Sequence, residues 1–368
     1  MKVTRTYALL PIALAGALAA SACGTDNNST GASGVSTSQA ANASSCTKLS
    51  GAGSSFQDPM EQQWAKDFPG TCKGAQINYQ AVGSGTGIQQ FGQGTIDYAG
   101  SDVVMKSDEQ AAADKRCGGS KAIHVPVSAG GVGVTWNLPG VTDLQFSPDT
   151  LAGIFQGTIK AWNDPQIKAD NSGANLPSTP ITVVYRSDSS GTTAVFTSFL
   201  TATSSKWKLG GDKTVNWPTG QGAEKNQGVS AAVAQTPGGI TYTEQAFATQ
   251  HQLPLGKIKS NSGSYVALTT ASVTAGVADA KFAGSGNNLV YESNFKTTKS
   301  DAYPISSYTY AIVCSAYPSS FGATKVDTLK KFLTYAVTAG QQAAPGLGFS
   351  PLPPDVAGKV QQAVSAVK

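Results

Sequence analysis

The residues of this sequence that are best suited to chemistry lie in a polar loop between two apolar segments. The loop begins at Arg186, ends at Thr192 and reads Arg-Ser-Asp-Ser-Ser-Gly-Thr. A guanidinium fits around oxyanions, the hydroxyls of Ser190 and Thr192 can donate hydrogen bonds, and Gly191 lets the backbone approach a ligand closely. The loop is therefore a candidate anion site. Taken alone, it is equally consistent with a capped helix start and a surface ion pair between Arg186 and Asp188.

The segments on either side of this loop position it. Residues 181–185 are β-branched or aromatic and predict a buried strand, whereas the apolar residues between Val195 and Leu200 fall on one face of a helix. The first N–H groups of a helix have no partner within it and lie at the positive end of its dipole. A helix that begins at this loop would therefore favour an anion.

The chain repeats this strand, loop and helix arrangement twice. Residues 49–56 read Leu-Ser-Gly-Ala-Gly-Ser-Ser-Phe, and Pro59 suits the first turn of a following helix. Residues 79–88 read Tyr-Gln-Ala-Val-Gly-Ser-Gly-Thr-Gly-Ile. Their glycine spacing does not match a dinucleotide fingerprint, and the sequence has no P-loop. Because ligands of open α/β sheets bind at the carboxyl ends of strands, we expect the three loops to line a cleft between two domains.

Asp102 ends a strand-like run in Gly-Ser-Asp and would repel an anion unless that anion carries a proton. Phosphate carries one near neutral pH and sulfate does not, so Asp102 could act as a filter that admits phosphate. The alternative is that Asp102 caps a helix beginning near Ser107, which its spacing alone favours.

The N-terminal residues are typical of an export signal. Residues 1–22 contain Lys2, Arg5 and an apolar run that is short for a membrane span, which indicates a signal peptide. Cys23 follows Ala-Ser-Ala as in a bacterial lipobox, so we expect it to be acylated, palmitate included. Residues 23–45 have almost no apolar side chains and should form a flexible linker.

Composition excludes several classes of function. Loss of residues 1–22 lowers the formal charge from +4 to +2, which is too little for a nucleic-acid surface. The two histidines lie far apart without a zinc motif, so we expect neither a metal nor a cofactor. Four cysteines remain besides Cys23, which suggests two disulfides with three possible pairings in an exported chain. They are Cys46, Cys72, Cys117 and Cys314.

Alternating strand-like and helix-like segments predict an α/β protein with mainly parallel sheets. The predicted strands are 77–82, 123–127, 132–136 and 181–185. The predicted helices are 60–68, 88–91, 150–155, 228–235, 326–338 and 356–367.

Four stretches together resemble the phosphate-binding proteins of Pst-type ABC transporters, over nearly all of the mature chain. They are residues 51–56, 79–85, 100–102 (Gly-Ser-Asp) and 186–192. The resemblance implies that phosphate contacts Ser55, Phe56, Ser84, Asp102, Arg186, Ser190, Gly191 and Thr192. It also implies that Asp188 holds the guanidinium of Arg186. The chain has Ser55 where Thr is usual in the family, and Gly-Thr-Gly at 85–87 where Ser-Gly-Gly is common.

The same resemblance implies a type II periplasmic-binding-protein fold, with two α/β lobes, a central cleft and a hinge of two crossovers. One lobe would comprise residues 46–127 and 304–368, and the other residues 128–303. We expect the disulfides Cys46–Cys72 and Cys117–Cys314 within this framework.

The expected function is extracytoplasmic binding of inorganic phosphate and its delivery to permease subunits. We expect the protein to be a monomer and not an enzyme. As a lipoprotein of the cell membrane, it would face the periplasm or cell-wall space. The alternatives are a receptor for another oxyanion, such as sulfate or phosphonate, and an exported phosphate-ester hydrolase. The hydrolase is disfavoured because the sequence has no GxSxG motif and few histidines.

Overall fold

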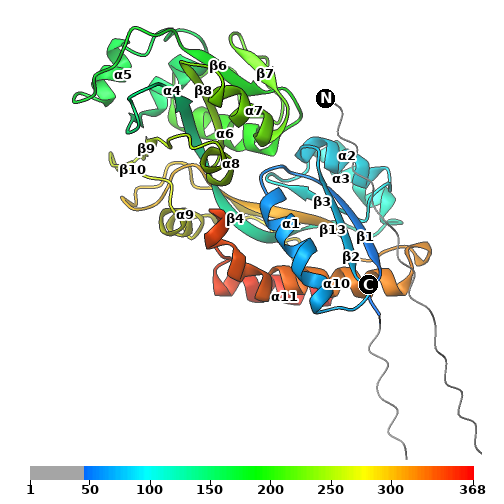
Figure 1. Ribbon diagram of the computed structural model, residues 1–368. Helices are drawn as coiled ribbons and strands as arrows, with labels where there is room; N and C mark the ends of the chain where they lie inside the picture. Colours follow the sequence, from blue (N-terminus) through cyan, green and yellow to red (C-terminus); the bar gives the residue numbers. More distant parts are fainter. Residues whose placement is uncertain (1–44) are drawn as a thin grey trace, which may run out of the picture. The chain divides into compact units, whose positions relative to one another are not determined.

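A mixed sheet of eight strands organises the part of the chain that the computed structural model describes, residues 45–368 (Figure 1). Its strand order is β2-β1-β3-β13-β4-β8-β6-β7. The strands are β1 (Lys48–Gly53), β2 (Gln76–Ala81), β3 (Tyr98–Ser101), β4 (Ala122–Asn137), β6 (Thr182–Arg186), β7 (Gln221–Ala223), β8 (Gly239–Glu244) and β13 (Ser306–Cys314). The predicted signal peptide, Cys23 and nearly all of the predicted linker lie outside the described residues.

The large sheet is parallel at both ends and antiparallel in the middle. β1 pairs in parallel with β2 and β3, and β6 pairs in parallel with β7 and β8. By contrast, β13 runs antiparallel to β3 and β4, and β4 runs antiparallel to β8. The prediction of mainly parallel sheets was therefore wrong for the centre. There β13, which comes late in the chain, lies between the early strands β3 and β4 and pairs with both.

The two strands predicted at 123–127 and 132–136 are one continuous strand, β4. Its first part pairs with β13 up to Gly131, and from Val132 onward it pairs with β8. Two glycines lie between the predicted strands, and they serve packing. A Cβ on Gly130 would lie 2.4 Å from the ring of Phe56, and one on Gly131 would lie 2.4 Å from the side chain of Leu268.

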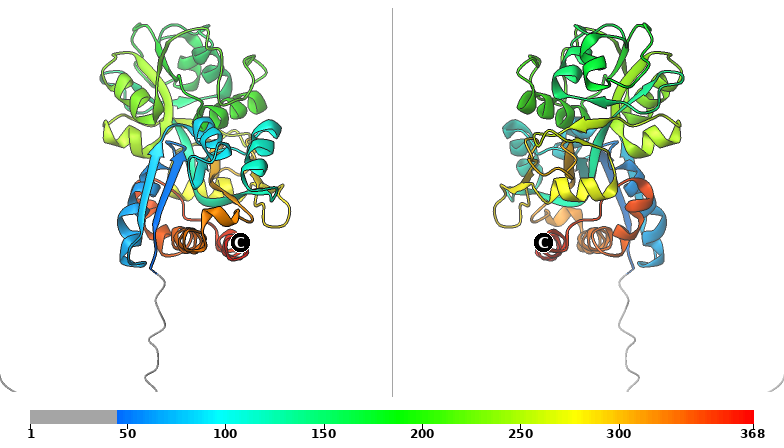
Figure 2. Two further views of the ribbon diagram at one scale, coloured as in Figure 1. Left: turned by 90° about the vertical axis from the view of Figure 1, so that its right-hand side faces the viewer. Right: turned by 90° about the vertical axis from the view of Figure 1, so that its left-hand side faces the viewer.

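The predicted helices all form, with ends that differ by a few residues. The helices are α1 (Asp58–Asp67), α2 (Ser84–Gly92), α3 (Ser107–Arg116), α4 (Pro148–Phe155), α5 (Pro165–Asp170), α6 (Gly191–Thr203), α7 (Lys225–Ala234), α8 (Gln245–Gln250), α9 (Thr270–Val277), α10 (Ala323–Ala336) and α11 (Pro354–Ser365). α10 and α11 lie side by side and pack on β1 and β4 respectively (Figures 1 and 2).

Short strands complete the fold. A three-stranded sheet contains β5 (Gln145–Phe146), β9 (Lys257–Lys259) and β10 (Tyr265–Val266), and a hairpin contains β11 (Lys281–Phe282) and β12 (Tyr291–Glu292).

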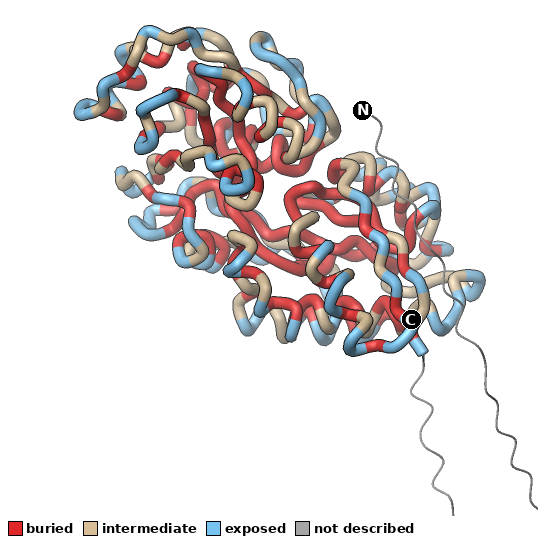
Figure 3. The backbone as a smooth tube through the Cα atoms, viewed as in Figure 1, coloured by how far each residue is buried: buried red, intermediate tan, exposed pale blue. Residues whose placement is uncertain are grey.

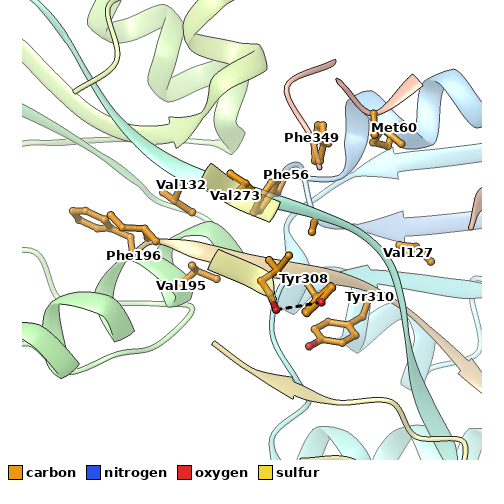
Figure 4. Close-up of a cluster of buried hydrophobic side chains, with 14 of the residues drawn as sticks. Phe56, Met60, Val127, Val132, Val195, Phe196, Val273, Tyr308, Tyr310 and Phe349 are labelled. Atoms are coloured by element: carbon orange, nitrogen blue, oxygen red, sulfur yellow. Dashed lines mark hydrogen bonds between the residues drawn. The ribbon is translucent and has the colours of Figure 1, made fainter. Parts of the chain in front are cut away.

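Several strands of the large sheet are buried over long stretches, as Figure 3 shows. β13 is buried along its whole length, and β4 along all but its last residue. One continuous apolar cluster includes Phe56 beside α1, Val132 of β4 and Phe196 of α6 (Figure 4). The segments that carry the candidate site are thus anchored in the same core.

Two disulfides form, Cys46–Cys72 and Cys117–Cys314, and these are the expected pairs. The first joins the segments before β1 and β2, and the second joins the end of α3 to the last residue of β13. Residues 44–368 form one compact unit, and the predicted division into two lobes stays a prediction. Within the described residues, no helix combines the length and apolar character that a bilayer crossing requires.

Candidate functional site

The carboxyl ends of several strands meet where the predicted loops lie. β1 ends at Gly53, level with the end of β2 and with Gly100 of β3, and α1 and α2 begin just beyond. On the other side, the parallel strands β6 and β8 end at Arg186 and Glu244, and α6 begins five residues after β6. The sheet therefore positions the helix starts that the sequence predicted.

Asp102 is the centre of the first group of contacts. Its Oδ1 accepts a hydrogen bond from Ser54 Oγ (2.5 Å), and its Oδ2 accepts one from Ser84 Oγ (3.2 Å). All three side chains are buried. The hydroxyls of the loops at 49–56 and 79–88 thus both reach the carboxylate of Asp102, which follows β3. Each carboxylate oxygen keeps a lone pair for a further donor.

The prediction that Asp102 caps α3 was wrong. The N-cap position of α3 is Lys106, whose backbone N–H bonds to the Glu109 side chain. Asp102 instead lies inside the protein, where burial raises its pKa to about 6, while the hydrogen bonds and the charge of Arg186 limit the rise.

The start of α6 packs directly against this acid. A Cβ on Gly191 would lie 2.3 Å from Asp102 Oδ2 and 2.4 Å from Ser84 Oγ. Only glycine allows so close an approach. In addition, the N–H of Gly85, at the start of α2, donates to the carbonyl of Ser189 (3.0 Å). The second and third predicted loops are therefore in contact.

Arg186 is buried and belongs to a network of contacts. Its Nε and Nη2 donate to the two carboxylate oxygens of Asp188 (2.7 and 2.5 Å), which is the predicted pairing. Burial by itself would raise the pKa of Asp188, but the hydrogen bonds and charge of Arg186 hold that pKa below its ordinary value. The ion pair exists, but Arg186 is only 3% exposed, so the alternative of a surface pair was wrong.

Asn226, which the sequence analysis missed, joins the two sides of the site. Its Nδ2 donates to Ser55 Oγ (3.0 Å) and to Thr192 Oγ1 (3.2 Å), and its Oδ1 accepts from Arg186 Nη1 (2.9 Å). Asn226 is fully buried in the first turn of α7. Nothing in its sequence context resembles a motif. The only signal was the start of another helix after a strand.

The remaining predicted residues lie in the same network. Ser55 Oγ accepts two hydrogen bonds from Asn226 and keeps its own proton to donate. The N–H of Phe56 donates to Ser54 Oγ (2.9 Å), and Ser190 Oγ caps α6 by accepting from the N–H of Thr193 (3.1 Å). Every residue predicted to contact phosphate is therefore buried in one region of the protein, and Asp188 beside them is partly buried.

Two ion pairs connect α3 to the segment after α6. Lys106 contacts Asp212 (2.6 Å), and the buried Lys213 contacts Glu109. The carbonyl of Lys213 also accepts from the N–H of Ser190 (2.9 Å), so these pairs support the third loop directly. Among residues 45–368, no three His, Cys, Asp or Glu side chains are grouped as a metal site would require.

Comparison with known proteins places the chain in a family. A PBP superfamily domain matches residues 37–339. Phosphate-binding protein PstS 3 of Mycobacterium tuberculosis is 40% identical over the full length of both chains, and PstS 2 of the same organism is 38% identical. PstS of Pasteurella multocida is 36% identical over 85% of this chain and 88% of its own. The chain therefore belongs to the PBP superfamily and, within it, to the family of PstS phosphate-binding proteins.

Solved structures show the same fold. A high-affinity periplasmic phosphate-binding protein, solved with phosphate, superposes with a TM-score of 0.70 at 23% identity, covering 86% of this chain and 93% of its own. A phosphate-binding protein from Stenotrophomonas maltophilia gives 0.64 at 22% identity over the same shares. The fold is that of a periplasmic binding protein, as the resemblance implied.

The position of Asn226 generates a stability prediction. Replacing Asn226 with Ala removes the acceptor of Arg186 Nη1 and both donors to the neighbouring hydroxyls. We expect a loss of about 1–3 kcal/mol in the free energy of unfolding, because buried charged donors are left unpaired. Denaturant unfolding measures this loss. Asn78→Ala, at an exposed position of β2, is the control. Its free energy of unfolding should stay within about 0.5 kcal/mol of the parent value. Equal stability of both variants would contradict the bridging role.

Proposed function

We propose that this chain binds inorganic phosphate at the site around Asp102 and Arg186. The observation that carries the proposal is a buried carboxylate among hydrogen-bond donors. Asp102 accepts from two serine hydroxyls, and the start of α6 lies against it. A bound anion must meet this acid, so it must supply a proton of its own. The names of the relatives, which describe phosphate-binding proteins, support this choice.

The residues proposed to hold the phosphate are those that the family resemblance implied. Ser55, Ser84 and Ser190 would supply hydroxyls, whereas Phe56, Gly191 and Thr192 would supply backbone N–H groups at helix starts. Arg186 would supply charge and Asp102 would accept the proton of the anion, with Asp188 orienting the guanidinium. In the described structure some of these groups bond to one another, so a bound phosphate would exchange those contacts for its own.

We further propose that the protein serves a phosphate ABC importer, passes phosphate to the permease subunits and acts as a monomer without enzymatic activity. Two lobes that close around the anion, with residues 46–127 and 304–368 opposing 128–303, would fit this task. The ion pairs Lys106–Asp212 and Lys213–Glu109 would then join the two lobes in the closed form.

Calorimetric titration of the purified, phosphate-free chain tests the function. We expect one phosphate per chain, with binding weakened by about 1.5–3 kcal/mol in Arg186→Ala, because a charge-assisted contact is lost. Lys160→Ala removes an exposed cation and should bind like the parent. If Arg186→Ala also binds like the parent, the assignment of the third loop is wrong. Repeated release of phosphate from an ester would instead favour a hydrolase.

The filter role of Asp102 predicts how sulfate behaves. At pH 8 Asp102 is ionised, and we expect sulfate to be rejected by several kcal/mol, the usual cost of opposed like charges. As the pH falls through about 6, Asp102 gains a proton, and sulfate binding should strengthen. Asp102→Asn should bind sulfate at both pH values, as competition against phosphate would show. Tight sulfate binding by the parent at pH 8 would refute the filter.

The proposed membrane attachment depends on Cys23 and makes the protein an extracytoplasmic lipoprotein. Mass spectrometry of the protein from expressing bacterial cells should find an N-terminal Cys23 carrying acyl chains. Cys23→Ala should yield protein in the extracytoplasmic fluid instead of the membrane fraction. An unmodified Cys23 in membrane-free material would contradict the anchor.

A further inference from the structure

Glu244 is a buried acid beside the site that the proposed function leaves unused. It is the last residue of β8 and is only 2% exposed. Its Oε1 accepts a hydrogen bond from Thr192 Oγ1 (2.8 Å), whereas its Oε2 has no hydrogen-bond partner although it is buried. A buried carboxylate oxygen without a partner is costly, and such atoms often belong to a functional site.

The bonds around Thr192 show what Glu244 does to the site. Thr192 Oγ1 lies within hydrogen-bond distance of two donors, Arg186 Nη1 (3.4 Å) and Asn226 Nδ2 (3.2 Å). A hydroxyl has two lone pairs and one proton, so the proton of Thr192 must go to Glu244. This hydroxyl therefore cannot donate to a bound anion. The polar atom beside this hydroxyl that has no partner is Oε2 of Glu244.

Among the described residues, no cationic side chain forms a hydrogen bond or an ion pair with Glu244. Among the elements packed against β8, α6 and α8 carry no charged residue. β6 carries Arg186, which is already paired with Asp188 through two hydrogen bonds. α7 carries Lys225, whose charge acts on Asp58. In β4, His124 lies eight residues from Val132, the partner of Glu244 in the sheet.

Two ionised acids and an anion would therefore face one another in a buried space, which is strongly unfavourable. Asp102 accepts two hydroxyl hydrogen bonds, which stabilise its ionised form, whereas Glu244 accepts one. We infer that Glu244 is a second acid of the anion site and that, in its protonated form, it donates a hydrogen bond from Oε2 to the bound phosphate. The inference rests on the proposed function and assigns the two acids opposite roles.

The electrostatic environment agrees with this assignment. Burial, followed by the charge of Asp102, raises the pKa of Glu244 to about 8, whereas the pKa of Asp102 is about 6. At pH 7 Glu244 therefore holds a proton and Asp102 does not. Above pH 8 the free protein loses the proton from Glu244 and must take it up again when phosphate binds. Phosphate binding should therefore weaken as the pH rises beyond 8.

The test compares the full chain with Glu244→Gln, which keeps the shape and a donor but cannot titrate. Phosphate is titrated by calorimetry between pH 6 and 9.5, in buffers with different ionisation enthalpies that reveal proton uptake. Phosphate itself also titrates in this range, but it does so equally for both proteins. Dividing the affinity of the parent by that of Glu244→Gln at each pH therefore removes this contribution. Above pH 8 we expect the parent to lose affinity about tenfold per pH unit relative to Glu244→Gln, and to take up one more proton per phosphate.

A control and a second measurement complete the experiment. Glu61 is also fully buried, bonded to Tyr98 (2.7 Å) and Gln57 (2.7 Å) and outside the proposed contacts, so Glu61→Gln should keep the parental slope above pH 8. Infrared spectra at pH 8.5 should show the C=O band of a neutral carboxylic acid that grows when phosphate binds the parent but not Glu244→Gln.

The outcomes separate the inference from the function on which it rests. If both proteins bind phosphate with parallel pH profiles and equal proton uptake, Glu244 is structural only and the inference is wrong. If Glu61→Gln also loses the slope, the effect is not specific to Glu244, and the inference falls as well. If neither the parent nor the variant binds phosphate at any pH, the proposed function itself fails.

Discussion

A guanidinium inside a protein needs hydrogen-bond acceptors and a negative charge beside it, and the site of this protein is arranged around that requirement. Arg186 meets it with Asp188 on one edge and with Asn226 on the other. These partners fix the loop before α6 and the first turn of α7. Because Asn226 also reaches Ser55, the same requirement links a middle segment of the chain to its beginning.

Pairing Arg186 with Asp188 also determines the electrostatic character of the site. The guanidinium still provides hydrogen-bond donors, but most of its charge is neutralised, so the site does not attract every anion strongly. In the proposed function, discrimination then depends on hydrogen bonding, because an ionised Asp102 can only accept a hydrogen bond and a protonated Glu244 would donate one. An anion that brings no proton of its own would leave Asp102 without that partner and facing a like charge.

The sequence predicted the strand, loop and helix units because each carries a local signal. Pro59 marks the start of α1, Ser190 caps α6 and β-branched residues form β6. The sequence did not predict that β4 is one strand. Its glycines make room for side chains from distant parts of the chain, and a sequence pattern does not show such contacts.

The same difference between local signals and distant contacts applies to the site residues. Residues within glycine- and serine-rich loops could be found, whereas Asn226 and Glu244 could not. Each acts through a partner that is distant in sequence, and only the sheet order brings β8 beside β6. For Asp102, spacing alone favoured the wrong role, that of a helix cap. A helix cap and a site acid look alike until the start of α3 is known.

The burial of the site has a kinetic consequence. Ser84, Ser190 and Asn226 have no exposed surface in this arrangement, so an anion held among them as proposed would be covered by protein. The anion can leave only after contacts such as that between Asn226 and Ser55 have separated, and its residence time is set by how often they do. Protein isolated from cells would then retain the anion through chromatography, and dialysis alone would remove it slowly.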